Sequence, residues 1–228
     1  MRQEYRDAQE IARRLVREVG EPLFYGRERI HVETSAALFR EDPLVRRAVD
    51  ELGARPDPAG HGLGHATKVA VDAGAIILVE RGPADPAGGV RRLVTLAHVA
   101  GVLHDIRREE KEHALRGAEE ARRLLRAFAL REDERDTIAR AVANHEAFRP
   151  SRPMGDADGQ LLSDALYDAD KFRWGPDNFS EMLWDMVARR DVPLSAVLGR
   201  FMKGLEGVGR IRETFRSETG RRYGPDFI

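Results

Sequence analysis

The stretch "LVTLAHVAGVLHD", residues 93–105, carries most of the information about the fold. Its first eleven residues are almost wholly apolar, and such a run is too long for a typical buried strand. The alanines and leucines within it favour a central helix. The run then ends abruptly in His104-Asp105, an imidazole beside a carboxylate, and both are costly to desolvate unless something binds them. This stretch therefore predicts a buried helix that ends at a polar site.

Outward from this helix, the chain is a succession of helical patterns cut by glycine and proline. Residues 3–19 place Ile11, Leu15 and Val19 at helical spacing, and Asp42-Pro43 is typical of a helix start. The segment 54–60, "ARPDPAG", is predicted to be a loop and a subdomain boundary. Strict two-residue alternation is almost absent. We therefore predict an all-α bundle, with helices near 3–19, 42–53, 61–81, 88–105, 110–128, 132–147 and 159–171 and three more within 179–220.

Composition restricts the classes of function. The chain has 228 residues, 34% of them charged, and a net charge of −1, which gives no argument for binding nucleic acid or an anionic membrane. It has no cysteine, so any metal site must use histidine, aspartate and glutamate. The first twenty residues lack the apolar segment of a signal peptide, and no stretch approaches the roughly 18 apolar residues of a spanning helix. We expect a soluble cytoplasmic protein.

Several predicted helices carry one metal-ligand type of residue on an apolar or small-residue face. Neighbours at steps of three or four define these faces: His65 with Val69, Ala73 and Ile76; His113 with Gly117 and Ala121; His145 with Ile138, Ala141 and Val142; Asp170 with Leu162 and Leu166. A single histidine on such a face is more often a hydrogen-bonded core residue than a ligand. Five helices that each supply one instead favour a shared site in the bundle core, where nitrogen and oxygen donors suit Mn²⁺, Fe²⁺, Ni²⁺ or Mg²⁺. We predict that His104 and Asp105 bind such an ion.

Together these residues resemble the HD superfamily of metal-dependent phosphohydrolases, whose pattern is a histidine, a His-Asp doublet and a distant aspartate on the helices of an α-bundle. "HGLGHATKV" (61–69) resembles its His-x-x-Arg-Val helix, with Lys68 in place of arginine. "VLHDI" (102–106) supplies the doublet, and "DALYDADKF" (164–172) resembles the motif of the last ligand. The resemblance covers roughly residues 61–175. It implies that the first metal is held by His65, His104, Asp105 and Asp170.

A subset of that family holds a second metal with two additional histidines. "HALRGAEEARRLL" (113–125) and "VANHE" (142–146) resemble the corresponding segments and imply that His113 and His145 complete the site. The cofactor is then one or two divalent ions of Mn, Fe, Ni, Mg or Co. The whole chain is expected to be one domain of this type, with residues 1–55 and 176–228 adding helices before and after the core.

The resemblance implies hydrolysis of a phosphoester bond in a nucleotide or another small phosphorylated compound, through a metal-activated water. Asp105 would orient this water. His61 would support the site or protonate the leaving group, although capping the helix start explains it equally well. Lys68 is assigned to catalysis as well. The residues predicted to bind the phosphate are cations near the ligands: Arg108, Lys171, Arg149 and Arg152.

Alternatives stay open for the function, for three aromatic residues and for the C-terminal segment. For the function, a di-iron oxygenase would use the same six ligands, and a non-catalytic metal or ligand sensor would need no open coordination position. The aromatic residues Phe172, Trp174 and Phe179 follow the last ligand and either pack in the core or stack on a base. The basic segment that ends the sequence either folds back over the site or frays.

Overall fold

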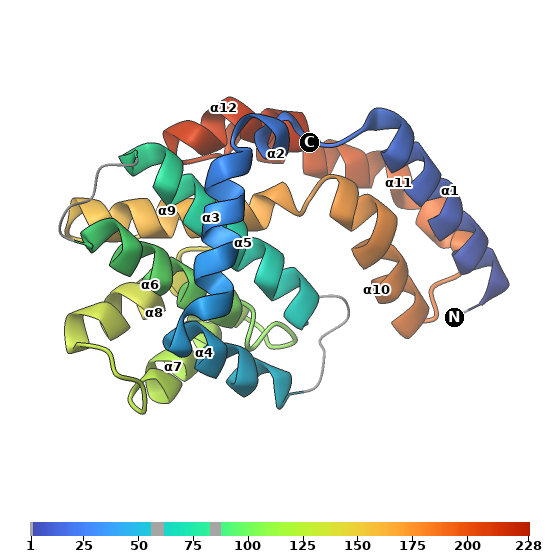
Figure 1. Cartoon of the computed structure of the whole chain (residues 1–228). Helices are drawn as coiled ribbons and strands as arrows, with labels where there is room; N and C mark the ends of the chain where they lie inside the picture. Colours follow the sequence, from blue (N-terminus) through green and yellow to red (C-terminus); the bar gives the residue numbers. More distant parts are fainter. Residues whose placement is uncertain (1, 56–61, 83–87) are drawn as a thin grey trace.

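The computed structural model describes residues 2–55, 62–82 and 88–228, and within them every regular element is a helix (Figure 1). The all-α prediction is confirmed. The helices are α1 (Gln3–Val19), α2 (Leu23–Arg27), α3 (Arg29–Glu41), α4 (Pro43–Gly53), α5 (Leu63–Arg81), α6 (Gly89–Leu103), α7 (His113–Leu125), α8 (Glu132–Ala143), α9 (Ala157–Phe172), the π-helix η1 (Asn178–Met182), α10 (Leu183–Arg189), α11 (Leu194–Gly209), the 3-10 helix η2 (Arg210–Glu213) and α12 (Glu218–Phe227).

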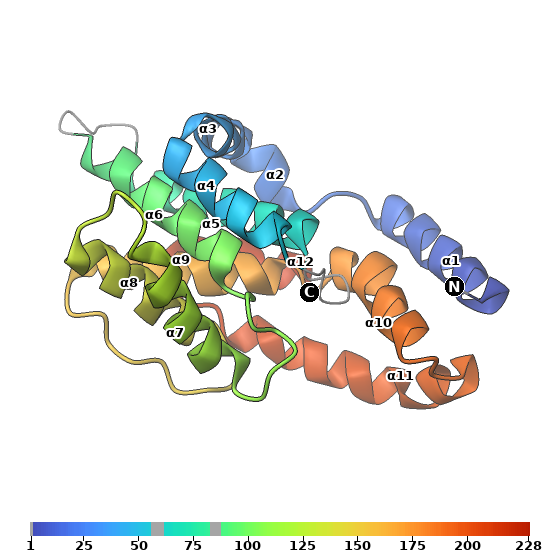
Figure 2. The ribbon, with the colours of Figure 1, turned by 90° about the horizontal axis from the view of Figure 1, so that it is seen from below.

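Helices α5 and α6 form the centre of the bundle. Every residue of α6 from Leu93 to Leu103 is buried, as the apolar run predicts. The two helices cross closely at Gly101, where an added Cβ would lie 2.5 Å from the Ala70 Cα. Around them, α3 and α4 cover one side, α7 and α8 another, and α9 packs against both central helices (Figure 2). Helix α6 therefore ends in the interior, so its last polar residues are enclosed by other helices.

The C-terminal segment folds back and packs α12 against α9 and α5. Its start is held by Asp168, whose carboxylate accepts hydrogen bonds from the backbone N–H of Arg216 and from the N–H and hydroxyl of Ser217. Farther along, Phe227 stacks on Phe172 with ring centroids 4.0 Å apart. Of the two alternatives for Phe172, core packing is therefore the one observed, and the C-terminal segment is ordered against the bundle.

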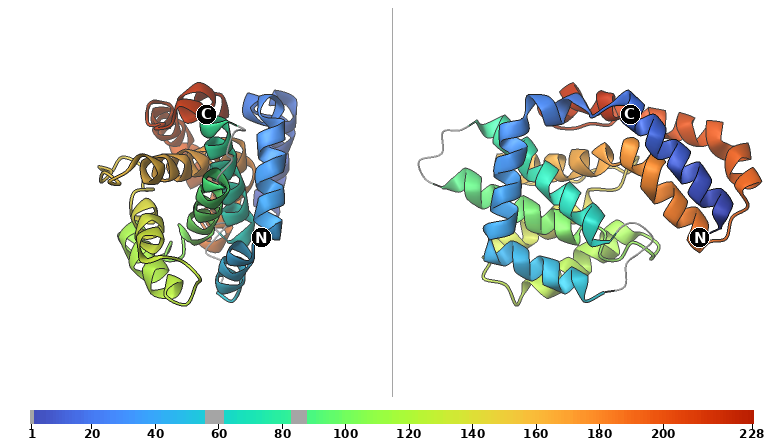
Figure 3. Two further views of the ribbon diagram at one scale, coloured as in Figure 1. Left: turned by 60° about the vertical axis from the view of Figure 1, so that its left-hand side comes forward. Right: turned by 45° about the vertical axis from the view of Figure 1, so that its right-hand side comes forward.

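Helices α1, α10 and α11 form a separate projection from the bundle (Figure 3). The bounds expected for the first helix are confirmed, but its predicted apolar face is not the buried one. Ile11, Leu15 and Val19 are exposed, whereas Tyr5, Gln9 and Ala12 are buried. Helix α1 packs on η1 and α10 through this second face, and Tyr5 donates a hydrogen bond from its hydroxyl to the Val192 carbonyl.

Three helices near the predicted site are shorter than expected. Helix α6 ends at Leu103 rather than 105, α7 begins at His113 rather than 110, and α8 ends at Ala143 rather than 147. The candidate ligands after α6 and α8 therefore lie just beyond helix ends. Residues 56–60 of the expected boundary loop, and His61, fall outside the described residues. No helix in the described part of the chain combines the length and apolar character needed to cross a membrane.

Candidate metal centre

The structure brings the six predicted ligand residues to one place in the bundle. They come from five parts of the chain: His65 from α5, His104 and Asp105 from the turn after α6, His113 from the start of α7, His145 from the segment after α8, and Asp170 from α9. His113 is half-buried and the other five are buried. Each prediction from helical spacing is thus matched by proximity, including Asp170 rather than Asp168 beside the histidines.

One set of donor atoms lies between α5, α9 and the end of α6. The Nε2 atom of His65 is 3.2 Å from the Nε2 of His104 and 3.4 Å from Oδ1 of Asp170. The Oδ2 atom of Asp105 lies 3.4 Å from the His104 Nε2. Two donors that each bind an ion at about 2.1 Å are separated by about 3.0–3.4 Å in tetrahedral or octahedral geometry. These three distances match the spacing of ligands around one cation, while the His65–Asp105 and His104–Asp170 pairs, at 3.9 Å and 3.7 Å, are somewhat longer.

A second set of donors lies on the other side of Asp105. Its Oδ1 atom is 3.3 Å from the Nε2 of His145 and 3.7 Å from the Nε2 of His113. The two carboxylate oxygens thus face different pairs of histidines. A carboxylate can bridge two cations in this way, whereas an imidazole presents one nitrogen to one ion. Asp105 has the position that a bridging ligand would need.

Backbone carbonyls orient two of the histidines. Nδ1 of His104 lies 2.7 Å from the Gly101 carbonyl, and Nδ1 of His145 lies 2.6 Å from the Val142 carbonyl. Because a carbonyl can only accept, each Nδ1 carries a proton and each Nε2 points into the cluster. Both carbonyls belong to the last turn of a helix, where the regular helical hydrogen bonds end, although the Val142 carbonyl also accepts a turn hydrogen bond from the His145 N–H at 3.4 Å. The early helix ends therefore place and orient the two imidazoles.

Lys171 is a buried cation that contacts two of the candidate ligand residues. It is only 2% exposed, and its Nζ donates to Oδ2 of Asp170 at 2.5 Å and to the carbonyl of His145 at 3.0 Å. Burial disfavours the charged carboxylate, but Lys171 and hydrogen bonds from His104 and His65 outweigh it and hold the pKa of Asp170 well below its usual value. Asp170 is therefore a carboxylate, with Oδ1 left facing the histidines.

The histidines of the two sets differ in their electrostatic surroundings. Burial disfavours a charged His104, but the carboxylates of Asp105 and Asp170 more than compensate and raise its pKa to about 10. Burial and the neighbouring His145 lower the pKa of His113 to about 4. The first set thus favours a positive charge between its carboxylates, and His113 is a neutral imidazole at ordinary pH.

The turn between α6 and α7 explains how His113 reaches the cluster only eight residues after Asp105. Successive turn hydrogen bonds run from the Arg108 N–H to the Asp105 carbonyl and from the Glu110 N–H to the Arg107 carbonyl. Glu112 then adopts a left-handed conformation with φ 55° and reverses the chain into α7. Gly117 permits α7 to approach this turn closely, since a Cβ at Gly117 would lie 3.2 Å from the His104 carbonyl oxygen.

The predicted phosphate-binding cations are not all at the cluster. Arg108 and Lys171 contact ligand residues, although Lys171 is buried and holds Asp170 rather than facing solvent. The other two are exposed and directed elsewhere: Arg149 lies 3.4 Å from Glu146, and Arg152 bonds through its backbone to Asn144. Lys68, which was assigned to catalysis, is also exposed and pairs with Asp177 at 2.9 Å.

Sequence reasoning missed two residues that position the segment after α8. The side-chain amide of Asn144 bonds to both backbone groups of Arg152 and to the Ser163 hydroxyl, so it closes the loop that follows the helix. Arg216 donates to the Asn144 carbonyl at 2.9 Å and lies over the Tyr167 ring. An asparagine directly before a candidate ligand is a recognisable helix-end signal, whereas Arg216 comes from a distant part of the chain and has no local signal.

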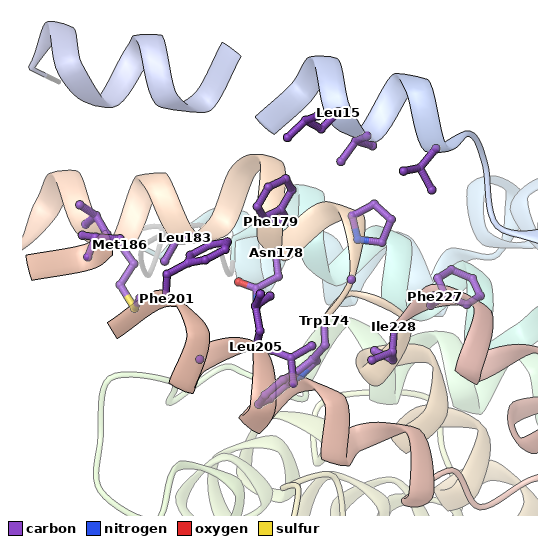
Figure 4. Close-up of a pocket in the computed structure, with 18 of the residues that line it drawn as sticks. Leu15, Trp174, Asn178, Phe179, Leu183, Met186, Phe201, Leu205, Phe227 and Ile228 are labelled. Atoms are coloured by element: carbon purple, nitrogen blue, oxygen red, sulfur yellow. The ribbon is translucent and has the colours of Figure 1, made fainter. Parts of the chain in front are cut away.

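Two cavities in the described part of the protein lie away from this cluster. One, of about 650 Å³, lies between α1, η1–α10 and α11 and has mainly apolar walls that include Leu15, Phe179 and Phe201 (Figure 4). The other, of about 640 Å³, borders Lys68 and the buried ion pair between Arg173 and Asp72. Neither is lined by any of the six ligand residues. The candidate ligand cluster is therefore defined by its donor geometry and lies outside both cavities.

The donor set is consistent with a divalent ion. Among the described residues, two overlapping groups have donor atoms within 4.8 Å of one another: His65 with His104 and Asp170, and His104 with Asp105 and His145. Imidazole nitrogens and carboxylate oxygens are the ligands that Mn²⁺, Fe²⁺, Ni²⁺ and Co²⁺ accept in proteins. Comparison with protein-family models, with curated proteins and with solved structures finds no match to this chain.

Proposed function

We propose that this chain is a metal-dependent phosphohydrolase of the HD type, acting on a nucleotide or another small phosphorylated compound. The observation that carries the proposal is the position of Asp105, whose two carboxylate oxygens face two different pairs of histidines while Asp170 closes the first set. The order of the motifs along the chain, a histidine, a His-Asp doublet and a distant aspartate, supports the same function.

In this proposal His65, His104, Asp105 and Asp170 hold one divalent ion. When bound, the ion would act as a Lewis acid toward a phosphoryl oxygen and lower the pKa of a water molecule. Lys171 keeps Asp170 ionised and fixes which of its oxygens faces inward. Asp105 orients the attacking water through the oxygen not used toward His104.

Substrate recognition would depend on cations that are only weakly engaged. Lys68 and Arg149 are directed away from the cluster, each toward one partly buried carboxylate, Asp177 and Glu146, and would have to turn toward the metal centre to bind substrate. An exposed ion pair contributes at most about 1 kcal/mol, so a phosphate dianion can compete for either cation. Lys171 is given a positioning role instead, because its ammonium is enclosed and already bonded.

The proposal is tested by metal analysis and a substrate screen. Chelator-treated protein is reloaded separately with Mn²⁺, Fe²⁺, Ni²⁺, Mg²⁺ and Co²⁺ and assayed against phosphomonoesters and phosphodiesters. We expect turnover only with metal, and a loss of more than about 100-fold in Asp170→Asn, since removal of a ligand exceeds the 10- to 100-fold typical of residues that merely support ligands. Asp164→Asn is the matched control, because Asp164 is on the same helix and contacts only Gln160 among the hydrogen bonds described.

Two outcomes would contradict the proposal. Full turnover in Asp170→Asn, or in protein free of metal, would remove the basis for a metal-dependent hydrolase. Protein that is purified without added metal and contains about two irons per chain, consumes O₂ and hydrolyses no phosphoester would instead identify an oxygenase that uses the same six ligands.

A further inference from the structure

Arg108 lies at the second set of donors, in the turn between α6 and α7. Its Nη1 atom is 3.0 Å from the Nε2 of His113 and 3.6 Å from Oδ1 of Asp105. The backbone N–H of Arg108 also donates to the Asp105 carbonyl at 2.9 Å, which fixes the start of the side chain beside the cluster. The guanidinium is half-buried and points inward, toward two of the atoms that would bind a second ion.

In the contact between Arg108 and His113, only one group can be the hydrogen-bond donor. A guanidinium is always charged and can only donate, so the hydrogen bond runs from the N–H of Arg108 to the Nε2 lone pair of His113. A metal ion would need the same lone pair. The positive charge of Arg108 also lies near Asp105 Oδ1, where a second ion would find its carboxylate. Arg108 and a second metal therefore compete for the same two donors.

The first set of donors is arranged differently. Its nearby cation, Lys171, contacts Oδ2 of Asp170 and leaves Oδ1 directed at His65. The Nδ1 of His104 is occupied by a backbone carbonyl, which leaves its Nε2 facing the same centre. Lys171 thus contacts an oxygen of the first set that does not face the other donors, whereas Arg108 contacts the donor atoms of the second set themselves.

We propose that Arg108 occupies the second metal position, so that the centre binds one divalent ion tightly and a second only when the guanidinium is displaced from His113. The proposal rests on the metal centre proposed above and adds that Arg108, not the number of ligands, sets the metal stoichiometry. His145 is then the ligand of the second set whose Nε2 is free of hydrogen bonds within the described residues. Arg108 is a positioning residue that controls access to His113.

The test is titration of chelator-treated full-length protein with Mn²⁺ alone, followed by calorimetry and by the electron paramagnetic resonance of bound Mn²⁺. Wild type is expected to bind one ion tightly and a second at least tenfold more weakly. Arg108→Met removes the charge but keeps the length of the side chain, and it is expected to tighten the second site by about tenfold or more. Spin coupling between two bound Mn²⁺ ions should then appear at lower metal concentration.

Control variants separate this effect from a general change in charge. Arg107→Met removes the neighbouring arginine, which contacts Glu110 and Glu120 instead of the cluster, and should leave both affinities unchanged. Adding His113→Ala to Arg108→Met should abolish the gain at the second site. Circular dichroism and thermal melting establish that each variant is folded. We expect folded variants because Arg107 and Arg108 are only half-buried.

The titration distinguishes failure of the role given to Arg108 from failure of the metal centre itself. Wild type that binds two Mn²⁺ ions with similar affinity, or Arg108→Met with unchanged affinity for the second ion, would overturn the role of Arg108 while leaving the metal centre standing. A folded wild type that binds no divalent ion at all would refute the metal centre and this inference together.

Discussion

His98 should make the stability of the fold depend on pH through a group outside the metal centre. It is fully buried on α6, and its Nε2 lies 2.9 Å from the Ser35 hydroxyl oxygen. That hydroxyl donates to the Val71 carbonyl, so it accepts from His98 Nε2–H, and Nδ1 of the ring is left unprotonated. Nδ1 has no hydrogen-bond partner among the described residues. Burial consequently lowers the pKa of His98 to about 3, against a smaller opposing effect of Asp42.

The sign and size of the effect follow from linkage. Between the unfolded pKa of 6.5 and the folded value of about 3, the unfolded chain binds a proton that the folded chain does not. The contribution of neutral, buried His98 to the unfolding free energy is therefore fully present above pH 6.5 and decreases as the pH falls below that value. Lowering the pH from about 7 to about 5 should cost about 2 kcal/mol of unfolding free energy through this one group.

The assay compares urea unfolding of wild type and His98→Gln at about pH 7, 6 and 5, in the presence of a chelator so that metal binding does not contribute. Glutamine retains a donor near the Nε2 position but has no titrating group. The decrease in unfolding free energy between pH 7 and 5 should be about 2 kcal/mol smaller in His98→Gln. His31→Gln is the control for removing a histidine, since His31 lies near the surface beside Glu28. Equal pH dependence in wild type and His98→Gln would refute a neutral buried His98.

Three further predictions concern packing and the cluster. Gly204→Leu should stabilise the protein by about 1 kcal/mol more than Gly207→Leu in thermal or urea unfolding, because both relieve a helical glycine but only position 204 lines the apolar cavity. Equal effects would mean that the cavity is not retained in solution. Gly101→Ala should destabilise by about 1–3 kcal/mol in the same assay, since its Cβ would meet the backbone of α5. In metal titration and phosphoester turnover, His145→Ala should impair the protein more than His113→Ala, whose donor atom already bonds to an arginine; the reverse order would contradict this.

Much of the architecture could be predicted because it depends on local rules. The bounds of α1 agree with the expected helix, and α4 starts where Asp42 accepts hydrogen bonds from the N–H groups of Leu44 and Val45, as an N-cap residue does. The buried run in α6 was equally evident, because a stretch of eleven residues that is apolar or small apart from Thr95 and His98 has no stable place at a surface. Helical periodicity also placed Asp170 inside, while Asp168 points to the start of α12.

Other expectations depended on partners that periodicity does not describe. The face of α1 with Ile11 and Leu15 has the stronger apolar pattern, yet the helix packs through Tyr5 and Ala12 because η1 and α10 lie on that side. The ends of α6 and α8 were misplaced because other hydrogen bonds replace the helical ones there. After α6 these are local turn bonds, from the Ile106 N–H to the Leu103 carbonyl and from the Arg108 N–H to the Asp105 carbonyl. At α8, the bonds that Asn144 makes to the loop are what ends the helix.

For the candidate site, the sequence alone indicated the six candidate ligand residues and the helices near which they lie, because donor chemistry and helical spacing are local properties. Only the tertiary structure decided how their atoms face one another. That the two oxygens of Asp105 face different histidines, and that Lys171 supports Asp170 while Arg108 caps His113, results from the packing of α5, α7 and α9 around the end of α6. A cation close in sequence to a carboxylate ligand can hold that carboxylate in place, bind the substrate or compete with the metal ion. Which of these roles it takes depends on a few ångströms and on which oxygen the cation contacts.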